Sequence, residues 1–457
     1  MHATRTTLLK LFICALAIRW VYALALFAIG GEAYLLGVDS QSYVYFARSF
    51  AAAIAAGSVD DWHWLGPDPN SMPLFAWLTT LCSLAFGTRG PLAYVLMQGA
   101  FDAGTCLVVF GIARAINPRY ALGASIAAVV NPTQIVMSGL VYPDAPFVFF
   151  VALFLYAAVN WIKSPSAGQA LLVGIALGGA ALMRMLIGPW ALAFPLFLLL
   201  TAWCRGQLSK RGFAEVTASA AVIAICIGLV LGRNVAEYKA WALTSQGGRH
   251  LALWIVPLVK EAQDGTPWAR TYADIEARMR ARFGAPDDNP FEESRRYVEI
   301  GREALASLDK IAAARAWAFG AAINLGAPAI ILSPPVISLP RTGFYGTPGI
   351  SMVDKIMKFL FQSESAAYAW ALLLGIAGVA IIRLVQLTGI VVLLRDGSNG
   401  CVLLLFALWF GYVLMVNGPV ASPKYRLPLE PLLAVLTGAG ACAFRRRRSE
   451  VPTPIAA

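Results

Sequence analysis

The sequence has little charge and almost no histidine. Only 13% of its 457 residues are Asp, Glu, Lys or Arg, and only three are His, whereas a soluble domain carries about 25% charged residues. Hydrophobic residues make up 59% of the chain, too many for one globular core to bury. The scarcity of charge therefore excludes a soluble single-core protein and predicts that lipid surrounds the chain.

The seven cysteines form no CxxC pair, and the three histidines are not grouped with them in the sequence. This spacing argues against a disulfide scaffold and against a zinc site. The net charge of +11 is spread over short loops and the C-terminal tail, with no basic patch interleaved with aromatic residues. We therefore interpret the charge as topology information and expect no nucleic-acid partner.

Apolar blocks of about 18–29 residues recur along the chain, each long enough to cross a bilayer. Clusters of Lys and Arg occupy alternate loops, and such clusters mark the cytoplasmic side. We therefore predict a multi-pass inner-membrane protein with a cytoplasmic N-terminus. Its fold should be all-α, with about ten to twelve transmembrane helices and amphipathic helices on the extracytoplasmic side. The expected spans lie near 8–30, 92–114, 120–140, 145–162, 169–183, 186–203, 216–233, 366–394, 401–417 and 428–444.

Two apolar stretches do not fit a plain crossing. Residues 73–87 are short for a span, so we expect a helix that lies along the outer interface or partly re-enters the membrane. Residues 317–363 are interrupted repeatedly by proline, which breaks helices. This stretch contributes either two crossings or none.

The chain divides into three parts. Residues 1–233 form an N-terminal membrane module with an outer loop at 31–91, and residues 317–457 form a C-terminal membrane module with a basic cytoplasmic tail. Between them, 234–316 contains twelve basic and twelve acidic residues, a balance that suits a water-facing helical layer. Apolar residues recur at helical spacing in this part: Tyr297, Ile300, Ala304, Leu308 and Ile311.

Asp39 follows the first span on the predicted outer side. An apolar stripe at helical spacing comes after it, so Asp39 should begin an amphipathic helix at the membrane surface, and Gly57 can end that helix. Asp39 can cap the helix or act as a general base at the membrane surface; the residues leave both roles open. The stripe consists of Tyr43, Phe46, Ala47, Phe50 and Ile54.

Asp144 lies between two strongly apolar spans, where a charge is costly unless it is paired or used. It can cap the helix that starts at Ala145 or take part in chemistry, and the residues do not decide. Cations also fall on the outer side. An arginine fork can contact two phosphate oxygens, although arginines at span ends also reach lipid headgroups. The candidates are Arg184, Arg233, Arg249, Lys424 and Arg426, together with His250.

Arg19 stands in the middle of the first span and cannot easily reach the headgroups. It should therefore face the protein interior or a wet cavity. Asp102, inside the second span, is its most natural partner, and we expect the two to form a structural ion pair.

Several motifs, in the same order along most of the chain, resemble the C-type membrane glycosyltransferases (GT-C), specifically the branch of protein O-mannosyltransferases and the lipid A aminoarabinose transferase. The motifs are Asp39 with Tyr43, MPLFAW at 72–77, NPTQIVMSGLVYPDAPF at 131–147, LMRMLIGPWAL at 182–192, GRNVAEYKAWALTSQGGRHL at 232–251 and KYRLPLEPLLAVL at 424–436. Ser40 departs from the family pattern, in which a second acid often follows the first. Asn70, Ser71 and Met72 stand where the aminoarabinose transferase has a lysine.

This resemblance implies an inverting transfer of a sugar from a polyprenyl-phosphate donor to a lipid, glycan or protein acceptor on the outer face. It implies that Asp39 deprotonates the acceptor and that Asp144 is the second carboxylate of the site. It assigns the donor phosphate to Arg184, Arg233, Lys424 and Arg426, and substrate contacts to Tyr43, Arg249, His250 and Tyr425. A divalent cation, Mg²⁺ or Mn²⁺, stays open, since two carboxylates without a third ligand are a weak argument for a metal.

Two other classes of protein stay open from the sequence. The main alternative is a transporter or flippase of a lipid-linked saccharide, but such proteins often show repeated halves and helices broken near mid-membrane, and no repeat is visible. The other is a membrane scaffold without chemistry, which predicts that Asp39 and Asp144 can be replaced freely.

Overall fold

The computed structural model describes residues 5–59, 65, 68–349, 351–397 and 400–449. These residues form helices and connecting loops, with no strand among them. Within these ranges, eight helical segments are long and apolar enough to cross a membrane, or nine if a bent pair counts as one span. The expected all-α polytopic membrane fold is therefore confirmed.

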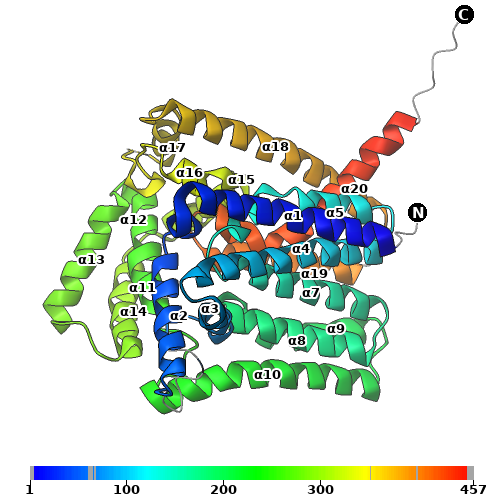
Figure 1. Cartoon of the computed structure of the whole chain (residues 1–457), viewed down its shortest axis with the longest axis horizontal. Coiled ribbons are helices and arrows are strands. Elements are labelled where there is room, and N and C mark those ends of the chain that lie inside the picture. Colours follow the sequence, from blue (N-terminus) through cyan, green and yellow to red (C-terminus); the bar gives the residue numbers. More distant parts are fainter. Residues whose placement is uncertain (1–4, 60–64, 66–67, 350, 398–399, 450–457) are drawn as a thin grey trace, which may run out of the picture.

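The long helices lie roughly side by side and form the membrane bundle (Figure 1). They are α1 (Arg5–Gly30), α4 (Gly90–Ile116), α7 (Asp144–Lys163), α9 (Gly188–Cys204), α10 (Lys210–Tyr238), α18 (Ala366–Arg395), α19 (Gly400–Asn417) and α20 (Glu430–Ser449). The bent pair is α5 (Ala121–Val129) and α6 (Pro132–Ser138), and a shorter apolar helix, α8 (Ala167–Met183), packs between α7 and α10. Apolar helices thus occur at all ten positions expected from the sequence, but eight or nine of the described segments, rather than the expected ten to twelve, are long and apolar enough to cross a membrane.

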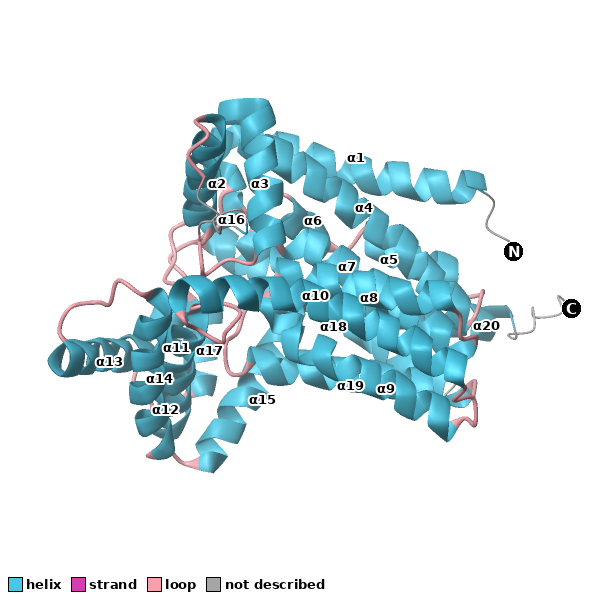
Figure 2. Ribbon diagram, turned by 90° about the horizontal axis from the view of Figure 1, so that it is seen from below, coloured by secondary structure: helices cyan, strands magenta, loops and turns pink. Residues whose placement is uncertain are grey.

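Two helices lie across one end of this bundle. The first, α2 (Ser40–Ala55), carries the apolar stripe that the sequence predicts, and Gly57 ends it with a positive φ of 66°. The second, α3 (Pro73–Phe86), is the short helix expected at 73–87. The α2 stripe packs on α3, with the rings of Phe50 and Trp77 5.3 Å apart. Figures 1 and 2 show both helices turned away from the bundle direction.

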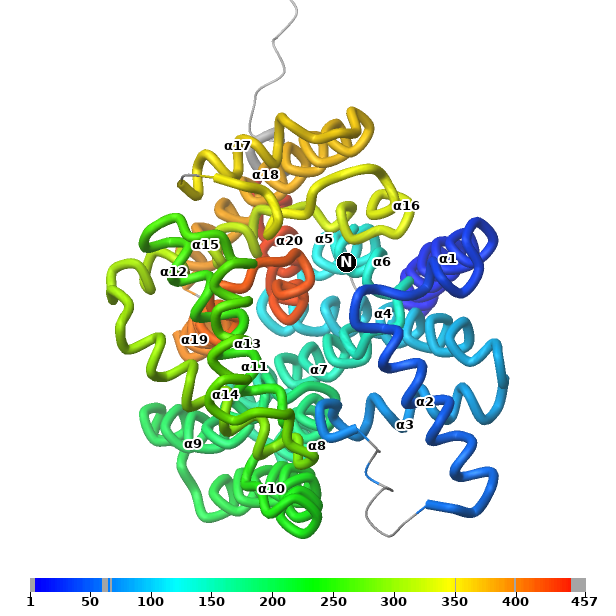
Figure 3. The backbone as a smooth tube through the Cα atoms, turned by 90° about the vertical axis from the view of Figure 1, so that its left-hand side faces the viewer, coloured from blue at the N-terminus to red at the C-terminus, as the bar shows by residue number. Residues whose placement is uncertain are grey.

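The same end of the bundle carries the helical layer expected at 234–316. It contains α11 (Gln246–His250), α12 (Val256–Asp264), α13 (Trp268–Phe283) and α14 (Pro290–Ala306). The start of α1 and the end of α20 lie at the opposite end (Figures 1 and 2). Seen end-on, α2 and α3 lie on one side of the ends of α7 and α20, and the layer lies on the other (Figure 3).

The predicted stripe in this layer is correct for four of its five residues. Tyr297 and Ile300 are buried, and Ala304 and Leu308 pack against the layer core, but Ile311 is 68% exposed. The reason is a break in the helix. Helix α14 ends at Ala306, and the Asp309 carboxylate caps a new helix, α15 (Lys310–Gly326), by accepting from the Ala312 N–H at 3.1 Å.

Residues 317–363 contribute no crossing by length and composition within the described ranges. After α15 the chain forms short pieces: a 3-10 turn η6 (Ala329–Leu332), α16 (Pro334–Ile337), a 3-10 turn η7 (Phe344–Gly346) and α17 (Met352–Phe361). Prolines explain these breaks, because proline lacks the N–H that continues a helix. By length and composition, the structure favours the alternative without a crossing.

Close contact between α18 and α20 depends on glycine. A Cβ atom at Gly389 would lie 2.0 Å from the Leu436 carbonyl oxygen, and one at Gly440 would lie 2.1 Å from the Val385 carbonyl oxygen. In lipid, helices associate through such close packing rather than through release of water. These glycines therefore help to hold α20 in place against α18. The segment that leads into α20 carries part of the candidate site.

Arg19 and Asp102 form the predicted ion pair inside the bundle. Arg19 Nε donates to Asp102 Oδ2 at 2.6 Å, and both side chains are buried. The Arg19 guanidinium also donates to the carbonyl oxygens of Ala128 and Val129, and Asp102 accepts from Gln134 Nε2 at 2.7 Å. Both charges are thus neutralised by protein, and α1, α4, α5 and α6 are held together.

Replacing one partner of this pair should leave a buried charge without compensation. We expect Arg19→Met to lower the free energy of unfolding by about 3–5 kcal/mol, measured by denaturant unfolding in detergent. The double variant with Asp102→Leu should recover much of that loss. Equal stability of Arg19→Met and wild type would contradict a buried, mutually dependent pair.

Candidate functional site

Asp39 immediately precedes α2, at the end of the bundle that α2 and α3 cross. Its backbone is helical and its side chain makes no capping hydrogen bond, so the capping interpretation is wrong for this carboxylate. Instead, Asp39 Oδ2 accepts from Lys424 Nζ at 3.1 Å, and 48% of the Asp39 side chain is exposed. Asp39 is therefore a water-accessible carboxylate beside a cation from a segment nearly 400 residues away.

The Asp39 backbone is fixed by its neighbour Ser40. The buried Ser40 hydroxyl donates to the Val141 carbonyl at 2.7 Å and accepts from the Gly37 N–H at 2.8 Å. Val141 N–H in turn donates to the Leu35 carbonyl. The serine that departs from the family pattern thus ties the Asp39 turn to the segment that precedes Asp144.

Lys424 lies in η8 (Pro423–Leu429), a 3-10 segment that leads into α20. Its side chain is 19% exposed, and its ammonium lies 5.1 Å from the ring centre of Tyr142 and 5.5 Å from that of Tyr425. Aromatic faces attract cations, so these two rings hold Lys424 toward Asp39. The predicted substrate contact Tyr425 is thus part of the site wall.

Asp144 is the first residue of α7, and its side chain is 2% exposed. It makes an ion pair with Arg184, which follows α8 and is 24% exposed. Helix α7 has no side-chain cap, so the capping interpretation fails for Asp144 as well. Burial lowers the pKa of Arg184, but the Asp144 carboxylate and its neighbours outweigh that effect and raise it, so this guanidinium stays charged.

Tyr43 links the Asp39–Lys424 pair to the Asp144–Arg184 pair. Burial and then the nearby Asp39 carboxylate raise the pKa of Tyr43 to about 12, and Arg184, Lys424 and Asp144 also act on it. Its ring packs edge-on against Phe75 at 4.8 Å. Tyr43 is therefore a neutral phenol at physiological pH, within electrostatic reach of all four charges.

A pocket with about 490 Å³ of empty space, part of it open to solvent, lies beside Tyr43 and Arg184. Two of its lining residues are joined, since Gln246 Nε2 donates to the Asn70 carbonyl at 2.8 Å, and the adjacent Ser245 Oγ donates to Asn70 Oδ1 at 2.6 Å. Among the described residues that line it, Arg184 is the one charged side chain. The pocket can therefore hold a neutral, hydroxyl-rich group next to a guanidinium.

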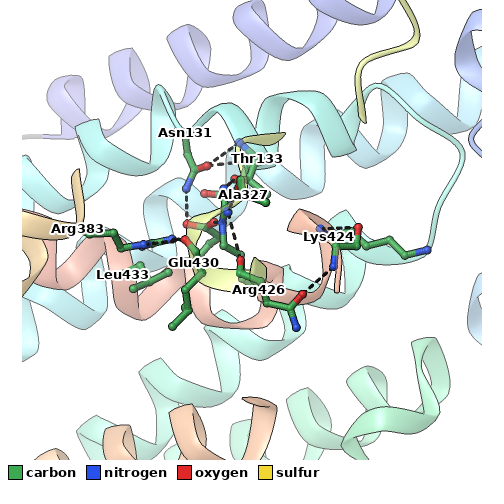
Figure 4. A network of polar contacts seen from close by, with 12 residues as sticks. Asn131, Thr133, Ala327, Arg383, Lys424, Arg426, Glu430 and Leu433 are labelled. Atoms are coloured by element: carbon green, nitrogen blue, oxygen red, sulfur yellow. Dashed lines mark hydrogen bonds and ion pairs between the residues drawn. The ribbon is translucent and has the colours of Figure 1, made fainter. Parts of the chain in front are cut away.

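Arg426 is two residues from Lys424, but its side chain points into the protein (Figure 4). It is 3% exposed, and it donates to Glu430 Oε1 at 2.8 Å, to Thr133 Oγ1 at 2.6 Å and to the Ala327 carbonyl. Glu430 also accepts from Asn131 Nδ2 at 2.7 Å. Arg426 thus ties η8 to α6 and to the chain after α15.

Arg233 is also buried away from the four charges. Its Nε donates to Asn234 Oδ1 at 2.8 Å and its Nη1 to the Leu65 carbonyl at 3.2 Å. Arg249 lies in the helical layer of residues 234–316, 5.2 Å from the ring centre of Tyr297. The structure therefore brings Asp39, Tyr43, Asp144, Arg184, Lys424 and Tyr425 together, and it places Arg233, Arg249, His250 and Arg426 in surrounding contacts.

Tyr142 is a site residue that the sequence reasoning did not single out. Its ring lies under Lys424, and a Cβ at Gly37 would lie 2.2 Å from its hydroxyl. Tyr94 Oη donates to its carbonyl at 2.8 Å. An aromatic residue two positions before Asp144 was the available signal, but one ring among fifteen tyrosines does not stand out.

Among the described residues, no cluster of three or more His, Cys, Asp or Glu could hold a metal ion.

Comparison with known proteins finds one family whose members resemble part of the chain. Residues 68–230 match the family described as dolichyl-phosphate-mannose-protein mannosyltransferase (PMT_2), which confirms the resemblance to C-type membrane glycosyltransferases. The matched segment spans α3 to α10 and includes Asp144 and Arg184. No curated protein matches the sequence.

Two solved structures are similar to this chain. One is the crystal structure of ArnT from Cupriavidus metallidurans bound to undecaprenyl phosphate, with 17% identity and a TM-score of 0.39. The other is the same protein in the apo state, with 16% identity and a TM-score of 0.37. Each similarity covers 99% of this chain and 82% of the other.

Replacing Arg426 should lower the stability of the protein much more than replacing Lys424. Arg426→Gln leaves Glu430 and buried carbonyl groups without a charged donor and should lower the free energy of unfolding by about 3–5 kcal/mol. Lys424→Gln removes a partly exposed pair and should change it by at most about 1 kcal/mol. Denaturant unfolding in one detergent checks both. Equal losses in the two variants would contradict this division.

His250 should make stability depend on pH. Burial lowers its pKa below the ordinary value of 6.5, so the unfolded chain binds the extra proton more readily. The stabilisation is fully present above pH 6.5 and is lost as the pH falls through the lowered pKa. The melting temperature of wild type should therefore drop more than that of His250→Gln between pH 7 and pH 5. Parallel pH profiles would contradict a buried neutral imidazole.

Proposed function

We propose that this protein is an inverting glycosyltransferase that takes its sugar from a polyprenyl-phosphate donor at the extracytoplasmic membrane surface. The observation that carries the proposal is the meeting of Asp39, Lys424, Asp144 and Arg184 at one end of an apolar bundle. The family match supports it, because the family is that of dolichyl-phosphate-mannose-protein mannosyltransferases, whose donor is a lipid-phosphate-linked sugar. A lipid-linked donor also explains why the reacting groups lie at the end of a membrane bundle.

Asp39 is the proposed general base. An acceptor hydroxyl loses its proton to Asp39 as its oxygen attacks the anomeric carbon of the donor sugar. The bond from that carbon to the phosphate oxygen breaks, and the phosphate keeps the electron pair. General bases typically contribute 10²–10⁴-fold to a rate. The 48% exposure of Asp39 gives an acceptor access to it.

Lys424 and Arg184 are the proposed phosphate partners. Both are partly exposed, and positive charge placed where phosphate charge develops stabilises the transition state. In this account the Lys424–Asp39 pair is the resting state. An incoming phosphate draws Lys424 toward itself and leaves Asp39 free to accept a proton. Asp144 holds the Arg184 guanidinium in place for the same phosphate.

Arg426 and Arg233 take positioning roles in this account, because their buried guanidinium groups already donate to protein oxygens. Arg426 holds η8, and η8 presents Lys424 and Tyr425. Tyr43 and Tyr425 line the substrate space beside the charges. Arg249 and His250 act through the layer that borders the pocket at Gln246. The acceptor can be a lipid, a glycan or a protein.

We further propose that the site faces outward from the inner membrane and that the N-terminus is cytoplasmic. The positions of the two chain ends support this, because the start of α1 and the end of α20 lie at the end opposite the site (Figure 2). The basic residues Arg445 to Arg448 follow the last apolar segment, and such clusters mark the cytoplasmic side.

Asp39→Asn should reduce sugar transfer by about 10²–10⁴-fold, because the amide cannot accept the proton. The matched control is Glu32→Gln, which neutralises an outer-end carboxylate that is 33% exposed and paired with Arg48. The assay follows loss of labelled polyprenyl-phosphate sugar and gain of labelled acceptor in membranes at equal expression.

Transfer should survive in Glu32→Gln and fail in Asp39→Asn. If Asp39→Asn transfers sugar as wild type does, the proposed base is wrong. If wild type moves a lipid-linked saccharide across the bilayer without cleaving it, the transporter alternative takes the place of the transferase.

A further inference from the structure

Helix α17 has an apolar face that the membrane bundle does not cover. Val353, Met357 and Phe361 recur every fourth residue and are 64%, 51% and 61% exposed. On α18, which follows directly, Trp370 and Leu374 are 65% and 67% exposed. Residues four apart share one face of a helix, so α17 presents one apolar face, the α17 stripe, and the start of α18 exposes apolar side chains as well.

A polar pocket lies behind this helix. It contains about 410 Å³ of empty space, part of it open to solvent. Side chains that can donate hydrogen bonds line it: Thr342, Thr347, Lys358, Gln362, Ser363 and Tyr368. It is separate from the pocket beside Tyr43, with which it shares no lining residue.

Two buried polar atoms at this place make no well-aligned hydrogen bond within the described part of the chain, although the Arg341 side chain lies close to the Tyr368 hydroxyl. They are the hydroxyl of Tyr368, a residue only 1% exposed, and Nε of Arg341. The guanidinium of Arg341 lies 5.1 Å from the centre of the Tyr368 ring. Leaving a buried donor unsatisfied costs about 1–3 kcal/mol, so these groups point to a ligand that accepts hydrogen bonds.

Lys358 is the cation that lines the pocket, and Arg341 lies beside it against the Tyr368 ring. Its ammonium lies 2.8 Å from Asp354 Oδ2, and its side chain is 33% exposed. A phosphate diester has several acceptor oxygens and one negative charge, which matches a lysine, an arginine and a buried hydroxyl.

We propose that this pocket binds the phosphate of a membrane phospholipid, with the α17 stripe lying among the acyl chains beside it. The stripe decides in favour of a lipid rather than free phosphate, because it places the pocket at headgroup depth. The site thus anchors the segment between α15 and α18 to the membrane surface. It does not depend on the proposed transferase activity.

The test uses the full-length protein in detergent and native mass spectrometry with phosphatidylglycerol, with diacylglycerol as the lipid that lacks a phosphate. Wild type should retain phosphatidylglycerol and not diacylglycerol. Lys358→Gln and Tyr368→Phe should each weaken retention about tenfold, the effect of one hydrogen bond to a charged group. Tyr368→Phe keeps the ring that packs against Arg341 and removes only the hydroxyl, so its folding should be unaffected.

The matched control is Lys260→Gln on α12. Lys260 forms an i,i+4 pair with Asp264 at 2.7 Å and is 34% exposed, nearly the same surroundings as Lys358, so this variant should bind as wild type does. Equal retention by wild type, Lys358→Gln and Tyr368→Phe would overturn the site. Displacement by millimolar inorganic phosphate would assign the pocket to free phosphate. Retention of a polyprenyl phosphate alone would assign it to the donor. Both results overturn the proposal.

Discussion

A charge inside a bilayer has no water to solvate it, so the protein has to supply its partners. Arg19 receives a carboxylate from α4 and carbonyl oxygens from the end of α5. Arg426 donates to Glu430, to Thr133 and to a carbonyl oxygen after α15. Each cluster joins helices that are far apart in the sequence. The placement of the site depends on the second cluster, because η8 carries both Arg426 and Lys424.

The site differs from these clusters in its access to water. Arg426 and Glu430 are almost completely buried, whereas Asp39, Arg184 and Lys424 keep between 19% and 48% of their side chains exposed. A buried ion pair whose hydrogen bonds are all made within the protein stabilises the fold, but a substrate cannot reach it. The half-open pairs at the end of the bundle can exchange partners, and this exchange is what the proposed chemistry requires. Rigid neighbours such as Ser40 and Tyr142 keep the pairs in place while they do so.

Much of the fold could be predicted from the sequence, because long apolar runs and alternating basic loops are strong signals. The Arg19–Asp102 pair was also predictable, since two opposite charges in lipid have few other partners. Burial was not predictable in the same way. Arg426 and Lys424 are two residues apart and both basic, and only the fold shows that one points inward and the other into the site. The break at Asp309 was hidden within a continuous helical pattern.

Binding of a polyprenyl phosphate tests the central claim most directly, because it asks whether the exposed cations form a phosphate site. The purified protein is titrated with the lipid in detergent, and wild type is compared with Lys424→Gln, Arg184→Gln and the surface control Lys260→Gln. The account predicts that the first two variants bind about tenfold or more weakly and that the control binds as wild type does. Equal affinity in all four proteins would contradict it.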